Sequence, residues 1–219
     1  NLNVQREVVK DLALKVAYVG KLGRKMAIGV DINPGLYGPG ATLGNINARR
    51  VYPGFGASWK MSTIANSTYS ALQVEVTKRY SRSISLQGAY TLSRSTDMFS
   101  GAGIGPETPN VFNPRTQWGP SDFDSKHIVS ASWIWELPKL SSLHPLVRGV
   151  AGSWQFNGLI SGRSGTPINI LIGDDIALSG TPNQRPNVIG EHRLPEDRPR
   201  GVKILAWFNR AAFASPATG

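Results

Sequence analysis

Apolar and polar side chains alternate along residues 67–98 in two runs, separated by a short basic segment. One set of alternate positions is mainly apolar: Leu72, Val74, Val76, Ile84, Leu86, Gly88, Tyr90 and Leu92. The positions between them are mainly polar. Because successive side chains of a strand point to opposite faces, the runs predict two β-strands with one apolar and one polar face. A turn near residues 79–83 would join them into a hairpin.

Four further segments show the same two-residue period: residues 1–9, 12–20, 126–138 and 153–171. Tight turns are expected at Lys10-Asp11 and Ser81-Arg82, whereas long segments rich in Gly, Pro and Asn cover residues 23–66, 96–125 and 172–219. Long structureless loops are uncommon in compact soluble domains, but they are typical of the outer side of transmembrane β-barrels. We therefore predict an all-β fold, an antiparallel up-and-down meander that forms a segment of a large transmembrane β-barrel with long extracellular loops.

Two sets of side chains are candidates for function in such a barrel. Polar positions in the middle of strands would face the lumen: Gln73, Glu75, Gln87, Gln155, Asn157 and Arg163. Aromatic residues near the ends of the apolar faces would form the membrane girdle: Tyr18, Tyr80, Tyr90, Trp133, Trp135 and Trp154. Amphipathic rings are favoured at the level of the lipid headgroups. A soluble or surface β-sandwich that binds carbohydrate or another polymer would show the same alternation and stays an alternative.

The composition agrees with many strands joined by irregular loops. The 219 residues are 40% apolar and 17% charged, and they include 24 Gly and 15 Pro. The chain has no cysteine, which excludes disulfides, thiolate metal sites and a Cys nucleophile. It has no window of about 18 apolar residues, so no membrane-spanning helix is expected. It starts at Asn1 without a signal peptide, which indicates a mature product or an internal piece of a longer chain.

The net charge of +10 raises the possibility of nucleic-acid binding. However, the Lys and Arg residues are spread in ones and twos, so we expect no nucleic-acid partner. In a barrel, two groups of cations would lie near lipid headgroups or phosphates: Lys78, Arg79 and Arg82 at a tight turn, and Arg24, Lys25, Arg49 and Arg50 in an outer loop.

Catalytic and metal-binding patterns are weak throughout the sequence. The histidines at positions 127, 144 and 192 are isolated, and the glycine-rich segment 101–107 lacks the Lys-Ser/Thr ending of a phosphate loop. Residues 161–167 approach a nucleophile elbow, but the second glycine comes one place too early. The carboxylates near 121–124 and 173–175 lack an EF-hand pattern, although calcium could stabilise a loop there. We expect no enzyme activity, no cofactor and no metal.

Several stretches occur in a characteristic order: NLNVQREV, LALKVAYVGKLG, DINP, NSTYSALQVEVTKRYSRSISLQGAYTLSRSTD, SDFDSKHIVSASWIWELP, GSWQFNGLISGRSGTPINI, RPNVIG and WFNRAAFASPATG. This ordered set covers nearly the whole chain and resembles the barrel region of Oar-like TonB-dependent receptors, which are common in acidobacteria. The resemblance implies a protein in the outer membrane of a Gram-negative bacterium. It implies energy-coupled uptake of an unknown extracellular ligand, with outer-membrane lipid, lipopolysaccharide and a TonB-type energy-coupling protein as partners.

The chain departs from the full pattern of that family. Receptors of this kind resemble barrels of about 22 strands with a plugged lumen. Residues 1–219 lack a plug domain, a segment that contacts TonB and the remaining C-terminal strands. We therefore expect them to be a partial receptor β-barrel domain of about six strands. Because lipid does not tolerate open sheet edges, such a piece is expected to be a fragment or a truncated reading frame.

Overall fold

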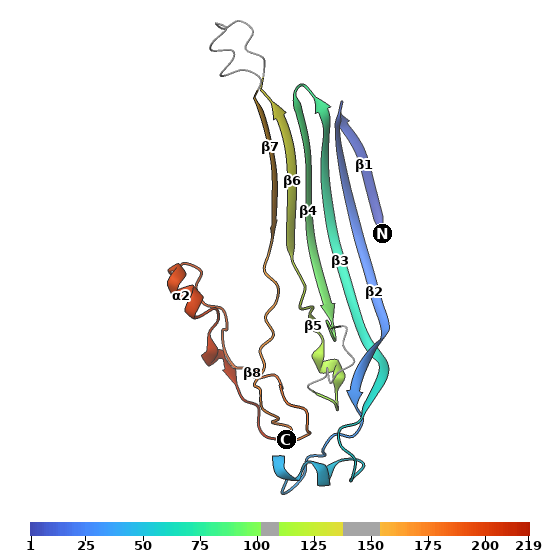
Figure 1. Ribbon diagram of the computed structural model, residues 1–219, viewed down its shortest axis with the longest axis vertical. Coiled ribbons are helices and arrows are strands. Elements are labelled where there is room, and N and C mark those ends of the chain that lie inside the picture. Colours follow the sequence, from blue (N-terminus) through green and yellow to red (C-terminus); the bar gives the residue numbers. More distant parts are fainter. Residues whose placement is uncertain (102–109, 138–153) are drawn as a thin grey trace, which may run out of the picture. The chain divides into compact units, whose positions relative to one another are not determined.

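The computed structural model describes residues 1–101, 110–137 and 154–219 (Figure 1). The long strands are β1 (Leu2–Val9), β2 (Leu12–Asp31), β3 (Trp59–Ser81), β4 (Ile84–Asp97), β6 (His127–Glu136) and β7 (Gln155–Arg163). They lie side by side in chain order in one sheet, and the two-residue strand β5 (Gly119–Pro120) pairs with β4. The strand pairs β1–β2, β3–β4, β4–β6 and β6–β7 are antiparallel. The predicted all-β meander is therefore confirmed.

The sandwich alternative requires a second sheet that packs face to face against the first. Within the described residues, the second sheet consists of β8 (Asn187–Val188) and β9 (Phe213–Ala214), each two residues long. A ribbon of this size cannot cover a face of the long sheet. The structure therefore disagrees with the sandwich alternative.

Tight turns connect β1 to β2 and β3 to β4. Arg82 and Ser83 both have positive φ angles, 50° and 66°, as a two-residue hairpin turn of type I′ requires. The second turn therefore lies one residue later than the predicted Ser81-Arg82. The backbone N–H of Arg79 donates to the carbonyl of Asp11 at 2.8 Å, so the two turns are neighbours at one end of the sheet.

The strands β2 and β3 are longer than their alternation predicted. We expected a loop over residues 23–66, whereas β2 continues to Asp31 and β3 begins at Trp59. Lys25 lies inside β2 with a left-handed φ of 52°. A residue in this conformation within a strand is typical of a β-bulge, which interrupts the two-residue period. The interruption explains why the sequence pattern placed the end of this strand too early.

The predicted strand over residues 153–171 is shorter in the structure, because β7 ends at Arg163. Gly165 and Pro167 follow, and a proline has no N–H to donate to a sheet ladder. Residues 138–153 lie outside the described residues, and they include the expected connection over residues 139–152 with His144. Residues 102–107 of the glycine-rich segment also lie outside them.

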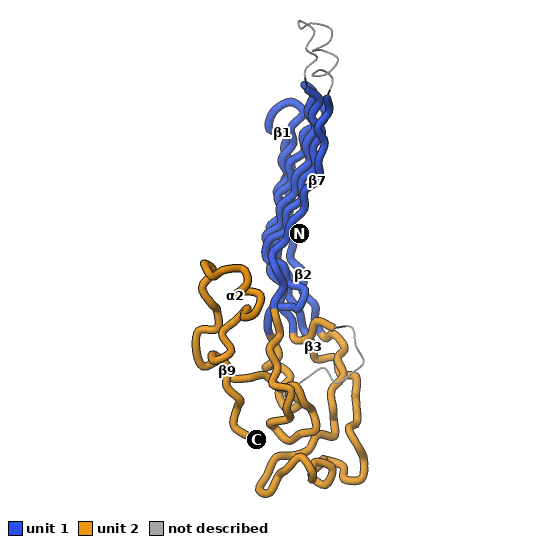
Figure 2. The backbone as a smooth tube through the Cα atoms, turned by 60° about the vertical axis from the view of Figure 1, so that its left-hand side comes forward, with its two compact units in different colours: residues 1–24, 66–97, 119–167 blue, residues 25–65, 98–118, 168–219 orange. Residues whose placement is uncertain are grey.

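The described chain divides into two compact units, coloured separately in Figure 2. Unit 1 comprises residues 1–24, 66–97 and 119–167, and unit 2 comprises residues 25–65, 98–118 and 168–219. Unit 1 contains the paired strand segments in which the two-residue period is regular. Unit 2 has a small apolar core of Ile28, Ala65 and Met98, residues that are 0%, 1% and 6% exposed.

Helical structure is scarce in the residues that the structure describes. The α-helix α2 (Arg200–Leu205) has six residues, and the 3-10 turns have three or four. Among the described residues, no helix is long and apolar enough to cross a membrane.

Candidate functional site

The strand registers place the six candidate lumen residues on one face of the sheet: Gln73, Glu75, Gln87, Gln155, Asn157 and Arg163. Directly opposed residues of neighbouring strands share a face. The pairs Thr77–Gln87 and Gln87–Ser132 carry this polar face from β3 through β4 to β6. The pair Ile134–Asn157 carries it on to β7. Unit 1 therefore has a predominantly polar face, which also includes Ile128, Ile134 and Leu159.

An ion pair extends the polar face to β2. The Nζ atom of Lys15 lies 3.2 Å from Oε1 of Glu75 on β3. Their side chains are 36% and 43% exposed, so solvent screens the attraction, and such a pair contributes about 1 kcal/mol or less to stability. Its contribution is to place a cation and an anion side by side on a surface otherwise rich in amides and hydroxyls.

Four of the six candidate girdle residues share the opposite face: Tyr18, Tyr90, Trp133 and Trp135. Tyr18 of β2 lies 3.4 Å from the hydroxyl of Ser70, which joins the strands on that face. Tyr90 contacts Nδ1 of His127 through its hydroxyl at 2.7 Å. This apolar face also contains the aliphatic residues of the opening pattern, Leu72, Val74, Val76, Ile84, Leu86 and Leu92.

Tyr80 and Trp154 lie outside the regular alternation. A register shift between Lys78 and Ser81 precedes the turn, and the hydroxyl of Tyr80 donates to the carboxylate of Glu136. Strand alternation therefore does not assign a face to Tyr80. Trp154 directly precedes β7, and its carbonyl accepts the backbone N–H of Leu137 at 2.8 Å.

Unit 2 contains a pocket of about 540 Å³. Residues from four parts of the chain line it: Tyr37; residues 110–113, 116 and 117; residues 177, 179 and 184–187; and Pro216 and Gly219. The volume is within the range of small-molecule sites, about 300–1,000 Å³. The pocket lies among the long connections between strands, which in barrels form the outer loops.

Polar contacts fix the walls of this pocket. Nε of Arg185 donates to Oε1 of Gln117 at 3.2 Å. Oδ1 of Asn110 accepts the backbone N–H groups of Phe112 and Asn113 at 3.1 and 2.9 Å. Oε1 of Gln184 accepts the backbone N–H of Ala177 at 2.9 Å, which fixes another part of the lining. Side chains held in this way are arranged before any ligand arrives, which lowers the entropy cost of binding.

The carboxylate of Asp175 supports the loop behind the pocket. It accepts the N–H and the hydroxyl of Ser179, the N–H of Gly180 at 2.6 Å and the side-chain amide of Gln184 at 3.0 Å. Its oxygens are therefore occupied by donors of the chain itself, which argues against Asp175 as a calcium ligand. No group of three or more His, Cys, Asp or Glu side chains that could hold a metal occurs in the part of the chain that the structure describes.

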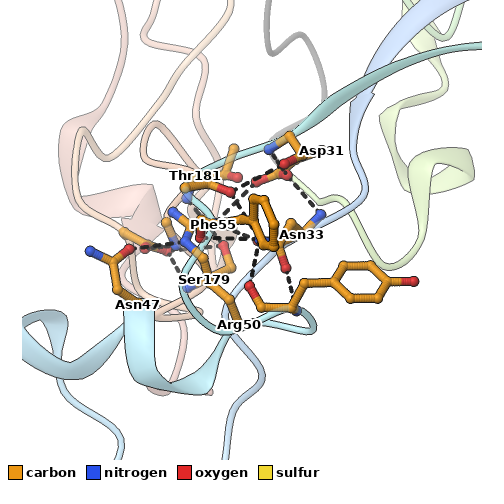
Figure 3. Close-up of polar contacts among 12 residues, drawn as sticks. Asp31, Asn33, Asn47, Arg50, Phe55, Ser179 and Thr181 are labelled. Carbon is orange, nitrogen blue, oxygen red and sulfur yellow. Dashed lines mark hydrogen bonds and ion pairs between the residues drawn. The ribbon is translucent and has the colours of Figure 1, made fainter.

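A buried polar cluster organises the connection between β2 and β3 (Figure 3). Oδ1 of Asp31 accepts the backbone N–H groups of Asn33 and Ser58 at 2.9 and 3.0 Å. Nη1 of Arg50 lies 3.6 Å from Oδ2 of Asp31, and Nε of Arg50 donates to Asn47 at 3.0 Å. The side chains of Asp31 and Arg50 are 0% and 7% exposed. A buried pair of this kind is sensitive to loss of either partner, which typically costs about 3–5 kcal/mol.

The structure corrects the expected role of Arg49 and Arg50. We expected both near lipid phosphates, but Arg50 is buried in the cluster and also donates to the carbonyl of Asn33. Nη2 of Arg49 donates to the carbonyls of Thr42 at 3.1 Å and Leu178 at 2.9 Å. Both guanidinium groups therefore satisfy groups of unit 2 itself. The cause is the long connection, whose many free carbonyls need donors.

The sequence patterns did not predict the pocket residues. Tyr37, Phe112 and Arg185 come from three separate segments, so no local motif joins them. The local pattern that pointed to the pocket was the concentration of Asn, Gln and aromatic residues in residues 110–118. Residues 31–33 also contained a signal, because an Asp that accepts the N–H two residues later forms an Asx-turn.

Comparison with known proteins identifies the family. A family model described as an outer membrane beta barrel domain matches residues 1–219, the whole length of the chain. No curated protein and no solved structure matches the chain. The single meander with one apolar and one polar face agrees with the architecture of such barrels, whose strands are apolar toward lipid and polar inside. The chain therefore belongs to the outer membrane beta barrel domain family, and the protein is located in the outer membrane of the cell.

Proposed function

We propose that this chain is a barrel segment of an Oar-like TonB-dependent receptor, which captures an extracellular ligand and passes it inward without chemical change. The ordered stretches that resemble such receptors support the proposal, because they cover nearly the whole chain. In this proposal lipid and lipopolysaccharide contact the apolar face. A TonB-type protein supplies the energy through parts of the receptor outside these residues, and nucleic acid is not a partner.

The observation that carries the proposal is the predominantly polar face of unit 1. Amides, hydroxyls and the Lys15–Glu75 pair follow one face across β2 to β7, while aliphatic and aromatic side chains follow the other. In a barrel with an apolar exterior, such a face lines the lumen. Gln87, Asn157 and Arg163 would then contact the plug or the passing ligand. The pocket in unit 2 would receive the ligand first.

Energy coupling can be tested in the native host. The gene is tagged at its own locus, living cells are treated with a short cross-linker, and the tagged protein is purified from the outer-membrane fraction. We expect a TonB-type protein among the cross-linked partners, and we expect a protonophore to change its yield. A tagged protein that reaches the outer membrane but yields no TonB-type partner in either condition would contradict the proposal, while membership in the barrel family would stand.

A further inference from the structure

The lining of the pocket in unit 2 has a distinct chemistry. Two aromatic rings, Tyr37 and Phe112, provide apolar surfaces, and five amide side chains come from Asn and Gln residues. Arg185 is the single charged side chain of the described lining, which includes no Asp or Glu. A ligand of this pocket is therefore expected to combine hydrogen-bonding groups, apolar ring faces and negative charge.

Two of the five amides, those of Asn110 and Gln117, have their oxygens engaged by donors of the chain itself. The oxygen of Asn110 already accepts two backbone N–H groups, and the oxygen of Gln117 already accepts from Arg185. The parts of these amides that these contacts leave for a ligand are their NH₂ groups. An NH₂ group can only donate, so the amides of Asn110 and Gln117 favour a ligand with acceptor oxygens.

Arg185 selects an oxyanion among acceptor-rich ligands. Its Nε is engaged by Gln117 at 3.2 Å, which orients the planar guanidinium group. The terminal Nη1 and Nη2 groups can then bind the two oxygens of a carboxylate side by side. The described lining includes no Asp or Glu side chain, and the carboxylate of Asp175 behind it accepts hydrogen bonds from Ser179, Gly180 and Gln184.

The aromatic rings distinguish a sugar acid from a small inorganic anion. Phosphate would use Arg185 and the amides but would make no use of the apolar rings of Tyr37 and Phe112. The flat apolar faces of pyranose rings pack on aromatic side chains, and their hydroxyl oxygens accept from amides. We propose that the pocket in unit 2 binds an acidic oligosaccharide through Arg185, Gln117, Asn110, Tyr37 and Phe112.

This inference deepens the proposed function, because it names the class of ligand that the receptor would capture. The test uses the full native protein, extracted from host outer membranes in detergent. Trigalacturonate, its methyl ester and inorganic phosphate are titrated separately in a calorimeter. We expect trigalacturonate to bind about 10- to 100-fold more tightly than the neutral ester, because the ester loses a charge-assisted hydrogen bond. We expect phosphate to bind more weakly than trigalacturonate.

Two variants and a control locate the site. Arg185→Gln should weaken trigalacturonate binding about 10-fold or more and leave ester binding unchanged. Phe112→Ala should weaken both saccharides. Arg193→Gln removes the same charge from an exposed position of unit 2 outside the pocket lining and should change neither affinity.

Several results would overturn the inference. With the native protein, they are a failure to bind trigalacturonate at millimolar concentration, equal affinity for the acid and its ester, or phosphate binding as tight as saccharide binding. With the variants, the contradicting result is an equal effect of Arg185→Gln and Arg193→Gln on trigalacturonate binding. The comparison of acid with ester needs only the native protein, so a variant that fails to fold leaves the inference open to refutation. Binding in detergent needs no energy source. Saccharide binding without a TonB-type partner would therefore refute the proposed uptake alone.

Discussion

Asn33 shows how one side chain can organise a loop. It is completely buried, and its Nδ2 group lies within 3.2 Å of the carbonyls of Tyr52 and Phe55 and 2.9 Å from that of Gly56. Its Oδ1 accepts the N–H of Tyr52 at 2.7 Å. An amide has two N–H protons, so one of them is shared between two carbonyls. The backbone of residues 52–56 therefore wraps around this single amide.

Asn33→Ala should loosen the connection between β2 and β3. The change leaves buried backbone groups without partners, and each such group costs about 1–3 kcal/mol. A total of about 3 kcal/mol would raise the population of the open loop roughly 100-fold. Limited proteolysis of the native protein with chymotrypsin measures this directly, because cleavage tracks the open population when reclosing is fast.

Asn3→Ala is the matched control, since Asn3 is exposed on β1. Its cleavage rate should equal that of the unchanged protein. If Asn33→Ala also left the rate unchanged, the amide would not be what holds the loop.

At the scale of single elements, β6 and β7 fit together through a glycine. Gly158 lies directly opposite Trp133 on the apolar face. A Cβ atom added at Gly158 would lie 2.2 Å from Cζ2 of the Trp133 indole, far inside van der Waals contact. The ring therefore lies across the glycine and covers the space that a side chain would need.

Gly158→Ala should force the Trp133 ring away from β7. Overpacking of this kind costs about 1–3 kcal/mol. The readout is the temperature at which the native protein loses its compact, fast-migrating form on an SDS gel. Gly88→Ala is the matched control, because it adds the same methyl group on the same face of β4, where no atom lies within 4 Å. Equal midpoints for the two variants would contradict the packing argument.

The two faces of β3 allow a second comparison at this scale. Val74 lies on the apolar face opposite Tyr90, whereas its neighbour Gln73 lies on the polar face opposite Thr91. Val74→Lys should reduce the amount of folded protein in the outer membrane, because a lysine facing lipid near the bilayer centre costs about 2–4 kcal/mol. Gln73→Lys adds the same group to the polar face and should be tolerated. Equal losses would show that the apolar face does not face lipid.

The sequence predicted elements best where one rule acts alone. Residues 67–98 keep a strict two-residue period, and the structure forms β3 and β4 there. The prediction was wrong at Lys25, where a left-handed residue breaks the period and the strand nevertheless continues. It also missed the contact between Arg49 and the carbonyl of Leu178, which are 129 positions apart. Contacts of that range depend on how the loops fold together, and no local pattern records them.

At the scale of the whole molecule, the sheet has two edges. In the described residues β1 and β7 are the terminal strands, each paired on one side. Inside a bilayer no water satisfies the free N–H and C=O groups of an edge, and each unsatisfied group costs several kcal/mol. Bacterial single-chain barrels have at least about eight strands. In the outer membrane, β1 and β7 are therefore expected to pair with further strands that close the barrel.

Closure can be tested with an antibody against residues 187–214, which the structure describes in full. We expect this antibody to detect, in host outer membranes, a band heavier than 23.7 kDa that migrates faster before boiling than after it. Residues 1–219 produced alone should give no such heat-dependent shift, because their edges stay open. A complex that falls to 23.7 kDa on boiling would mean that copies of this chain close the barrel together. A soluble band at that mass would contradict closure in the membrane altogether.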